Sequence, residues 1–118
     1  LAVDRTDDRV TDLYAPHHPA VVRLLAAIAR AARRQRCPVS VCGEMAADPA
    51  TLGLLVGLGY RTFSMRPAAV PFAKDALGRI SAAGARRAAR EALRARDIDG
   101  VERAIRQMEA GTMVPNHE

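Results

Sequence analysis

Cys37 and Cys42 are the only two cysteines of this chain, and a thiol can serve as a nucleophile, a proton donor or a metal ligand. If the residues between them are extended, their Cα atoms lie roughly 16 Å apart at ~3.3 Å per residue. A disulfide requires Cα atoms within ~7 Å, and four intervening residues match no common zinc motif. We therefore expect two separate thiols in a reducing compartment.

Cys42 stands where a predicted strand gives way to a loop. Alternating residues predict a short buried strand over 38–42, bounded by Pro38 and Gly43. In parallel α/β architectures, ligands and catalytic groups gather at the carboxyl ends of strands. Position alone leaves Cys42 as either a functional thiol or a small buried hydrophobe. Cys37, at the start of the strand, is expected to be an inert packing residue.

The residues that follow Cys42 favour a functional site. Gly43 lets a backbone or ligand approach closely, and Glu44 would place a carboxylate at the mouth of the site. Asp48 and Pro49 are a capping residue and a first helical residue, so the next helix directs its positive end toward the same face. Glu44 has a second interpretation, as a loop carboxylate held by an arginine.

The elements that must position this site alternate between helix and strand. Apolar periodicity and breaker residues predict helices over 17–36, 49–57 and 67–80, and strands over 38–42 and 61–65. This alternation indicates parallel strands joined by helical crossovers. A parallel strand requires neighbours on both edges, so we expect an α/β fold that is the last part of a larger domain, cut from a longer chain.

Two further helices follow without a strand between them. The sequence predicts them over 81–95 and 97–111, the second with Asp99 and Glu102 at capping-box spacing. Together they read as an appended helical hairpin. The apolar face of the second consists of Ile98, Val101, Ile105 and Met108.

Charge and hydropathy exclude several classes of partner. The net charge of +5 is carried by arginine, with Lys74 as the one lysine, and aromatic residues make up 3% of the chain. Because few rings are available to stack on bases, we interpret the densest arginine cluster as a solvated helix face and expect no nucleic acid. No apolar run approaches the ~20 residues of a membrane span. We expect a soluble, cytoplasmic protein. The clustered arginines are Arg86, Arg87, Arg90, Arg94 and Arg96.

Four stretches together resemble enzyme I of the bacterial phosphoenolpyruvate-dependent sugar phosphotransferase system. They are LAVDR at 1–5, HPAVVRLL at 18–25, VCGEMAADP at 41–49 and LLVGLGYRTFSM at 54–65. The resemblance implies the C-terminal fragment of a phosphoenolpyruvate-binding (β/α)8 TIM-type barrel with appended C-terminal helices. It divides the chain into the last βα units of the barrel (1–80), the helical hairpin (81–112) and a frayed tail (113–118).

The resemblance also implies roles for individual residues. Cys42 matches the family's catalytic cysteine, the acid that protonates the methylene carbon of the enolate as pyruvate forms. A cysteine thiol ordinarily has a pKa near ~8.5 and is mostly protonated at neutral pH, so it can supply that proton. A nucleophilic Cys42 would need a nearby base, and no histidine lies in this unit. Gly43 and Glu44 are expected to shape the substrate pocket.

Arg5 matches the family arginine that contacts the phosphate of phosphoenolpyruvate. A guanidinium can bind two oxygens at once and disperse charge as phosphate departs. Without the resemblance, Arg5 would be interpreted as a surface ion-pair partner. In the family the phosphorylated histidine belongs to a separate N-terminal domain that passes the phosphoryl group to the carrier protein HPr. We therefore expect His17 and His18 to cap a helix and face solvent.

Some expected features are altered or lie outside these residues. Ala47 replaces a family glycine, and Arg66 replaces a small polar residue, where it could cap a helix or add charge near the anion site. The family's Mg²⁺ is held by carboxylates on earlier strands, so we expect no metal ligands here and no activity from this chain alone. The resemblance also implies a homodimer.

The sequence leaves two alternative functions and the branch of the phosphotransferase system undecided. A pyruvate phosphate dikinase or phosphoenolpyruvate synthase uses the same barrel, although CGEMA at 42–46 disfavours it. A truncated, non-catalytic barrel acting as an interaction module is the alternative from another class. The sugar-related and nitrogen-related branches of the phosphotransferase system are not distinguished by these residues.

Overall fold

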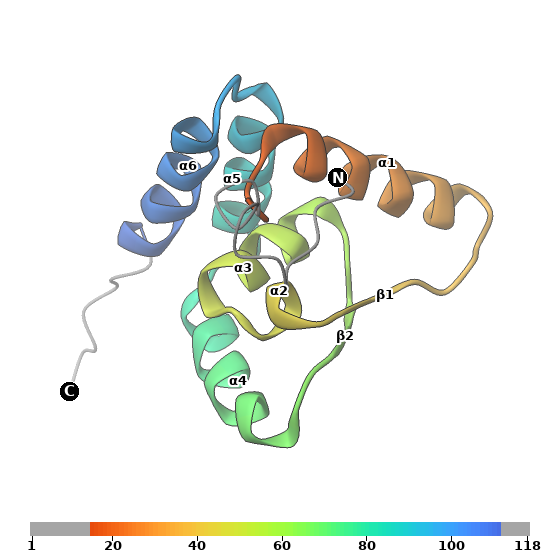
Figure 1. Ribbon diagram of the computed structural model, residues 1–118. Helices are drawn as coiled ribbons and strands as arrows, with labels where there is room; N and C mark the ends of the chain where they lie inside the picture. Colours follow the sequence, from red (N-terminus) through yellow and green to blue (C-terminus); the bar gives the residue numbers. More distant parts are fainter. Residues whose placement is uncertain (1–14, 112–118) are drawn as a thin grey trace, which may run out of the picture.

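The structure is a computed structural model that describes residues 15–111, so Arg5 and the tail over 113–118 lie outside the described residues. Figure 1 shows the order of the elements along the chain. They are α1 (Pro19–Arg34), β1 (Ser40–Cys42), α2 (Glu44–Ala47), α3 (Pro49–Leu58), β2 (Thr62–Ser64), the 3-10 helix η2 (Pro67–Ala69), α4 (Val70–Arg79), α5 (Ala82–Arg94) and α6 (Ile98–Ala110).

The described residues form a mostly helical fold with a two-stranded parallel sheet. β1 pairs with β2 in the register Ser40 to Thr62, Val41 to Phe63 and Cys42 to Ser64. The predicted parallel pair with a helical crossover is confirmed. The expected buried strand over 38–42 is wrong, because β1 begins at Ser40 and its ends are exposed. Each strand has one neighbour among the described residues, so one edge of each is uncovered.

Local capping signals determine where most helices begin and end. His18 caps α1, where its Nδ1 accepts a hydrogen bond from the amide of Ala20 at 3.1 Å, and Pro19 is the first helical residue. Asp48 caps α3 as predicted, and Gly59 ends it at a φ of 113°, in the left-handed region. The expected capping box of α6 is wrong. Asp97, in extended backbone, caps that helix by accepting from Gly100 N at 2.8 Å.

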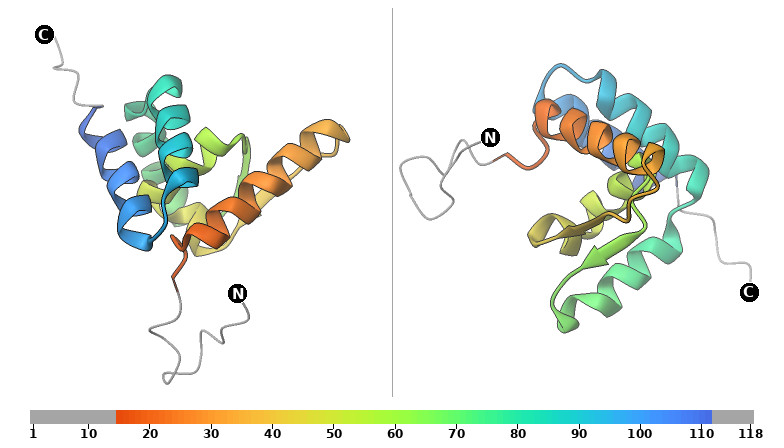
Figure 2. Two further views of the ribbon diagram at one scale, coloured as in Figure 1. Left: turned by 90° about the horizontal axis from the view of Figure 1, so that it is seen from above. Right: turned by 90° about the vertical axis from the view of Figure 1, so that its right-hand side faces the viewer.

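The main core lies where the helical hairpin packs on α3. Figure 2 shows α5 and α6 side by side as an antiparallel pair. Small side chains along α5 let it approach α3 closely, and larger ones from α3 and α6 fill the remaining space. Because this core draws on both predicted parts of the chain, the hairpin is packed onto the α/β part. Its buried members are Val22, Leu54, Ala85, Ala88, Ala89, Ala92, Val101, Ala104, Ile105 and Met108.

A second cluster supports the sheet, with Tyr60 at its centre. Tyr60 is 1% exposed and packs with Ala29 and Leu55. Its hydroxyl donates a hydrogen bond to the backbone oxygen of Leu25 at 2.9 Å. Through this hydrogen bond and its packing, Tyr60 connects α1 to the start of β2.

Replacing Tyr60 with phenylalanine removes the hydroxyl and tests the contribution of this hydrogen bond. We expect Tyr60→Phe to lower the free energy of unfolding by about 1 kcal/mol near neutral pH. Burial raises the pKa of Tyr60 above its usual 10.0, so its stabilisation is fully present below pH 10 and is lost as the pH rises through the raised value. Urea unfolding on both sides of that pH measures both effects. A variant that loses stability above pH 10 as steeply as the wild type would contradict this role.

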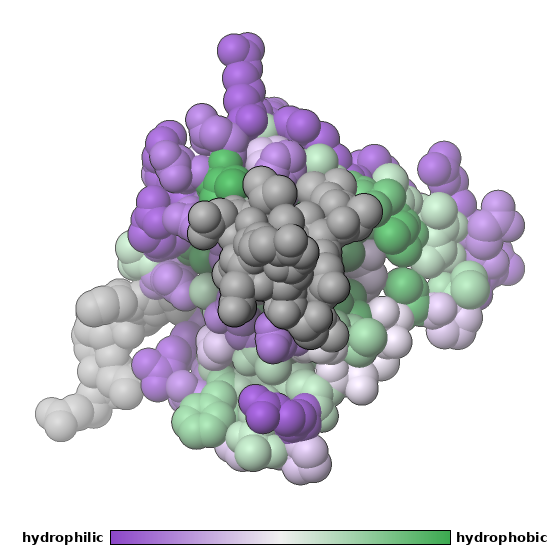
Figure 3. All heavy atoms as spheres, viewed as in Figure 1, coloured by the Kyte–Doolittle hydropathy of each residue, from purple (hydrophilic) through white to green (hydrophobic). Residues whose placement is uncertain are grey.

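Part of the apolar surface is uncovered in the described residues. The apolar spacing of α1 predicts that Ile28 shares a buried stripe with Val22, Leu25 and Ala29. Ile28 is nevertheless 42% exposed, and Leu24 beside it is 58% exposed. Phe72 on α4 is 69% exposed. Figure 3 shows hydrophobic atoms reaching the surface beside α1, while the side formed by α6 is hydrophilic.

The described residues also bear on membranes and on the arginine cluster. Between residues 15 and 111 no helix is long and apolar enough to cross a membrane. The clustered arginines of α5 and the following loop are all exposed, which agrees with a solvated helix face.

Candidate functional site at the carboxyl ends of the strands

The pairing register brings Cys42 beside Ser64. Both residues end their strands at the same edge of the parallel sheet, so their Cα atoms are lateral neighbours at the ~4.8 Å spacing of paired strands. Cys42 is a free, exposed thiol. Its interpretation as a small buried hydrophobe is therefore wrong. The sequence alone pointed to Cys42, but the place of Ser64 depends on the register.

The turn after Cys42 depends on Gly43. Its φ of 82° and ψ of −165° lie in a region that residues with a Cβ rarely adopt. Glu44 is the first residue of α2 and is exposed, and no arginine among residues 15–111 holds it. Ala47 needs no positive φ, because Arg36 is the one non-glycine residue with positive φ in the described part of the chain. The alanine is thus compatible with this turn.

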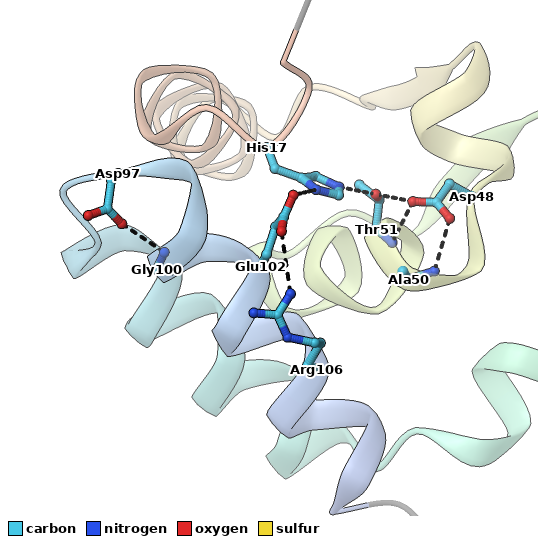
Figure 4. A network of polar contacts seen from close by, with 8 residues as sticks. All are labelled: His17, Asp48, Ala50, Thr51, Asp97, Gly100, Glu102 and Arg106. Atoms are coloured by element: carbon cyan, nitrogen blue, oxygen red, sulfur yellow. Dashed lines mark hydrogen bonds and ion pairs between the residues drawn. The ribbon is translucent and has the colours of Figure 1, made fainter.

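A polar network fixes the start of α3 directly behind this turn. The carboxylate of Asp48 accepts hydrogen bonds from Ala50 N at 3.3 Å, from Thr51 N at 3.1 Å and from the hydroxyl of Thr51. His17 Nε2 lies 2.7 Å from Thr51 Oγ1. Figure 4 shows His17, from the segment before α1, pointing toward Thr51 and Asp48 at the start of α3. The backbone N–H of Asp48 also donates to the oxygen of Glu44 at 2.9 Å.

Glu102 on α6 completes the network from the hairpin side. Its Oε1 lies 4.0 Å from His17 Nδ1, and its Oε2 lies 3.3 Å from Arg106 Nη1. The side chain of His17 is 20% exposed, so the expectation that this histidine faces solvent is wrong. Its partners lie far along the chain, and no spacing in the sequence indicates them. His18 caps its helix as expected.

Arg66 follows β2 at the same edge of the sheet as Cys42. Its backbone is the N-cap of η2, but its side chain makes no capping hydrogen bond and is exposed. The alternative in which the Arg66 side chain caps a helix is therefore not observed. A positive charge near the carboxyl ends of the strands remains as the second interpretation.

Cys37 lies at the opposite end of the sheet from Cys42. It is exposed, so its interpretation as a packing residue is wrong. A cavity of about 310 Å³ opens there between the C-terminal ends of α1 and α3, with Cys37, Arg30, Arg33 and Arg61 in its lining. The distance between the two ends keeps this cavity separate from the site around Cys42.

The described part of the chain offers no metal centre. Across residues 15–111, no three His, Cys, Asp or Glu side chains are grouped so that they could hold a metal ion. The residues present at the site therefore do not fit a Mg²⁺ ion by themselves.

Comparison with known proteins gives the family. Residues 1–82, more than half of the chain, match the family described as PEP-utilising enzyme, PEP-binding domain. This chain belongs to that family. The match covers the strand ends, with Cys42, Gly43 and Glu44, and it also covers Arg5.

Individual relatives of this chain share one name or a variant of it. A phosphoenolpyruvate-protein phosphotransferase of Cupriavidus necator is 54% identical over 68 residues, which is 58% of this chain and 12% of the relative. A protein of Escherichia coli named phosphoenolpyruvate-dependent phosphotransferase system is 46% identical over 95 residues, 80% of this chain and 13% of the relative. The phosphoenolpyruvate-protein phosphotransferase of Bacillus subtilis is 37% identical over 81 residues, 69% of this chain and 14% of the relative. The chain thus spans about an eighth of the length of these relatives.

Proposed function

We propose that these residues are the C-terminal part of an enzyme I type phosphoenolpyruvate-protein phosphotransferase. The observation that carries the proposal is an exposed thiol at the carboxyl end of a parallel strand, in a chain whose relatives bear that name. In this reaction phosphoenolpyruvate gives its phosphoryl group to an enzyme histidine, and pyruvate is released. The phosphorylated histidine then passes the group to HPr. The phosphorylated histidine belongs to a part of the protein outside these residues.

Cys42 acts in this proposal as the proton donor to carbon. Once the phosphoryl group has left, the enolate of pyruvate carries electron density on its methylene carbon. The S–H bond of Cys42 breaks as a C–H bond forms, which yields pyruvate and a thiolate. Because Cys42 is exposed, the thiolate can regain its proton from water. In the reverse direction the thiolate is the base.

Three other residues are assigned to substrate binding. Arg5 is placed on the phosphate, where a guanidinium offers two parallel hydrogen bonds. Gly43 adds no side chain to the turn, and the space beside it is open, because no heavy atom lies within 4 Å of a Cβ built there. Glu44, exposed beside it, would bound the pocket.

The barrel is the second element of the proposal. Among residues 15–111 each strand has an uncovered edge, and Leu24 and Ile28 on α1 leave apolar surface uncovered. Further βα units of a (β/α)8 barrel would cover these edges and this surface. The proposal also includes a cytoplasmic homodimer that serves sugar transport and uses Mg²⁺. The carboxylates that hold Mg²⁺ would come from strands outside the described residues, where the ion would offset charge on the transferring phosphoryl group.

A labelled-phosphate assay tests this function. The protein at its natural length is incubated with Mg²⁺, HPr and phosphoenolpyruvate that carries a radioactive phosphate. We expect label on HPr and one pyruvate per phosphoryl group transferred, with both lost when EDTA removes the metal. Pyruvate that forms only when a nucleotide is added would favour the dikinase or synthase alternative. A protein that transfers no phosphoryl group under any of these conditions would favour the non-catalytic module.

A further inference from the structure

We propose that His17, in its protonated form, is a positioning residue that couples the C-terminal helical hairpin to the segment following Cys42. The inference rests on the proposed function only in naming Cys42 as the group that the segment serves. Its basis is the contact of one imidazole with two elements, Thr51 of α3 at 2.7 Å and Glu102 of α6 at 4.0 Å.

The hydrogen-bond directions around Thr51 assign one proton of His17. A threonine hydroxyl has a single proton, and that of Thr51 is donated to the carboxylate of Asp48. The oxygen of Thr51 must then accept from His17, so Nε2 carries a hydrogen. A neutral imidazole has one N–H, and its Nδ1 would therefore direct a lone pair toward the carboxylate of Glu102. Protonation of Nδ1 replaces this repulsion with an ion pair.

Carboxylates lie on two sides of His17. Glu102 faces it from α6, and the carboxylate of Asp48 lies beyond the hydroxyl of Thr51 on the α3 side. Arg106 pairs with the second oxygen of Glu102 at 3.3 Å, which orients the carboxylate and shares part of its charge. His18, the residue after His17, does not face this network: its Nδ1 accepts a hydrogen bond from Ala20 N and caps α1. Two carboxylates therefore flank the imidazole, while one arginine lies behind Glu102.

The network continues to the candidate site through Asp48. This residue ends α2 and caps α3. Its amide donates to the oxygen of Glu44 at 2.9 Å, two residues after Cys42. Figure 4 shows the contacts from Glu102 through His17 and Thr51 to Asp48. The backbone hydrogen bond from Asp48 to Glu44 extends this series and links α6 to the turn that carries the site.

Hydrogen exchange tests the coupling in the protein at its natural length. Exchange rates of the amides of Asp48, Ala50 and Thr51 are measured at about pH 5.5 and about pH 8.5, on either side of the range in which histidines ordinarily titrate, and are normalised to intrinsic rates. His17→Gln keeps an N–H that can reach Thr51 but cannot become charged, and Glu102→Gln removes the facing charge. We expect both variants to raise these rates about 3-fold or more at the lower pH. At the higher pH, where the neutral imidazole gains nothing from the facing charge, Glu102→Gln should exchange no faster than the wild type.

The matched control is Glu109→Gln, which removes an exposed carboxylate from the same helix. A Glu102→Gln protein that is indistinguishable from this control at the lower pH would overturn the coupling. An equal effect of Glu102→Gln at both pH values would also overturn it, because packing alone would then be responsible.

A turnover measurement separates this inference from the proposed function. Pyruvate formation by His17→Gln should fall about 3-fold relative to wild type at about pH 5.5, with a smaller fall at about pH 8.5. If the wild type does not turn over phosphoenolpyruvate, the proposed function fails while hydrogen exchange still reports on the coupling. If turnover is normal and exchange shows no dependence on Glu102, only the coupling fails.

Discussion

Replacing Gly57 with alanine is expected to destabilise the fold by about 3 kcal/mol, because α3 and α5 touch at this point. A Cβ built on Gly57 would overlap the backbone oxygen of Ala85, and it would lie 2.6 Å from the carbonyl carbon of Ala85 and 3.0 Å from the Cβ of Ala89. The atoms of Ala85 that it would meet belong to the backbone, so they cannot move away by a change of rotamer as a flexible side chain can. The two helices must separate, and separation opens the core between the hairpin and α3.

Gly78 provides the matched control for this substitution. It lies within α4, and a Cβ built there meets no heavy atom within 4 Å. Gly78→Ala should therefore raise the free energy of unfolding by about 0.5–1 kcal/mol, the helix-propensity difference between the two residues. Urea unfolding of the wild type and both variants measures the contrast. A Gly57→Ala protein within about 0.5 kcal/mol of wild type would show that α3 and α5 are not packed as described.

Local signals predicted the parts of the fold that depend on neighbours in sequence. Asp48, predicted as the cap of α3, was confirmed, and Pro19 at the start of α1 and Gly59 at the end of α3 are signals of the same local kind. Each acts through a hydrogen bond or a backbone angle within a few residues, so its effect can be read from spacing. The predicted capping of α6 by Asp99 is wrong because the helix begins one residue earlier, at Ile98, which places Asp99 in the first turn and leaves Asp97, in extended backbone, as the acceptor.

Burial and distant contacts were harder to predict. Ile28 has the spacing of a buried residue, yet it is 42% exposed, because periodicity gives the faces of a helix but not which of them is covered. The contacts of His17 with Thr51 and Glu102 depend on how α1, α3 and α6 pack together. For the same reason, the sequence indicated Cys42 as the site residue, while the place of Ser64 beside it required the register of the sheet.

Replacing Cys42 with serine is expected to lower pyruvate formation by about 100-fold to 10,000-fold, the usual contribution of a general acid. Serine has nearly the shape of cysteine, but its hydroxyl gives up a proton far less readily than a thiol. Because Cys42 is exposed, the substitution should change the free energy of unfolding by less than about 0.5 kcal/mol. The loss would therefore reflect chemistry and not folding.

Cys37→Ser is the control for this substitution. Cys37 is the second free, exposed thiol of the chain, and it lines the cavity at the opposite end of the sheet. General sensitivity to thiol loss would affect both variants alike. Under the proposed mechanism, Cys37→Ser should keep the turnover of the wild type.

The central claim is that the thiol of Cys42 gives a proton to the substrate carbon. The most direct measurement is the rate of pyruvate formation by wild type, Cys42→Ser and Cys37→Ser at natural length, with phosphoenolpyruvate affinity measured in parallel. We predict that affinity stays within about 3-fold of the wild type in both variants, and that Cys42→Ser alone loses turnover, by about 100-fold or more. Near-normal pyruvate formation by Cys42→Ser would contradict the assignment.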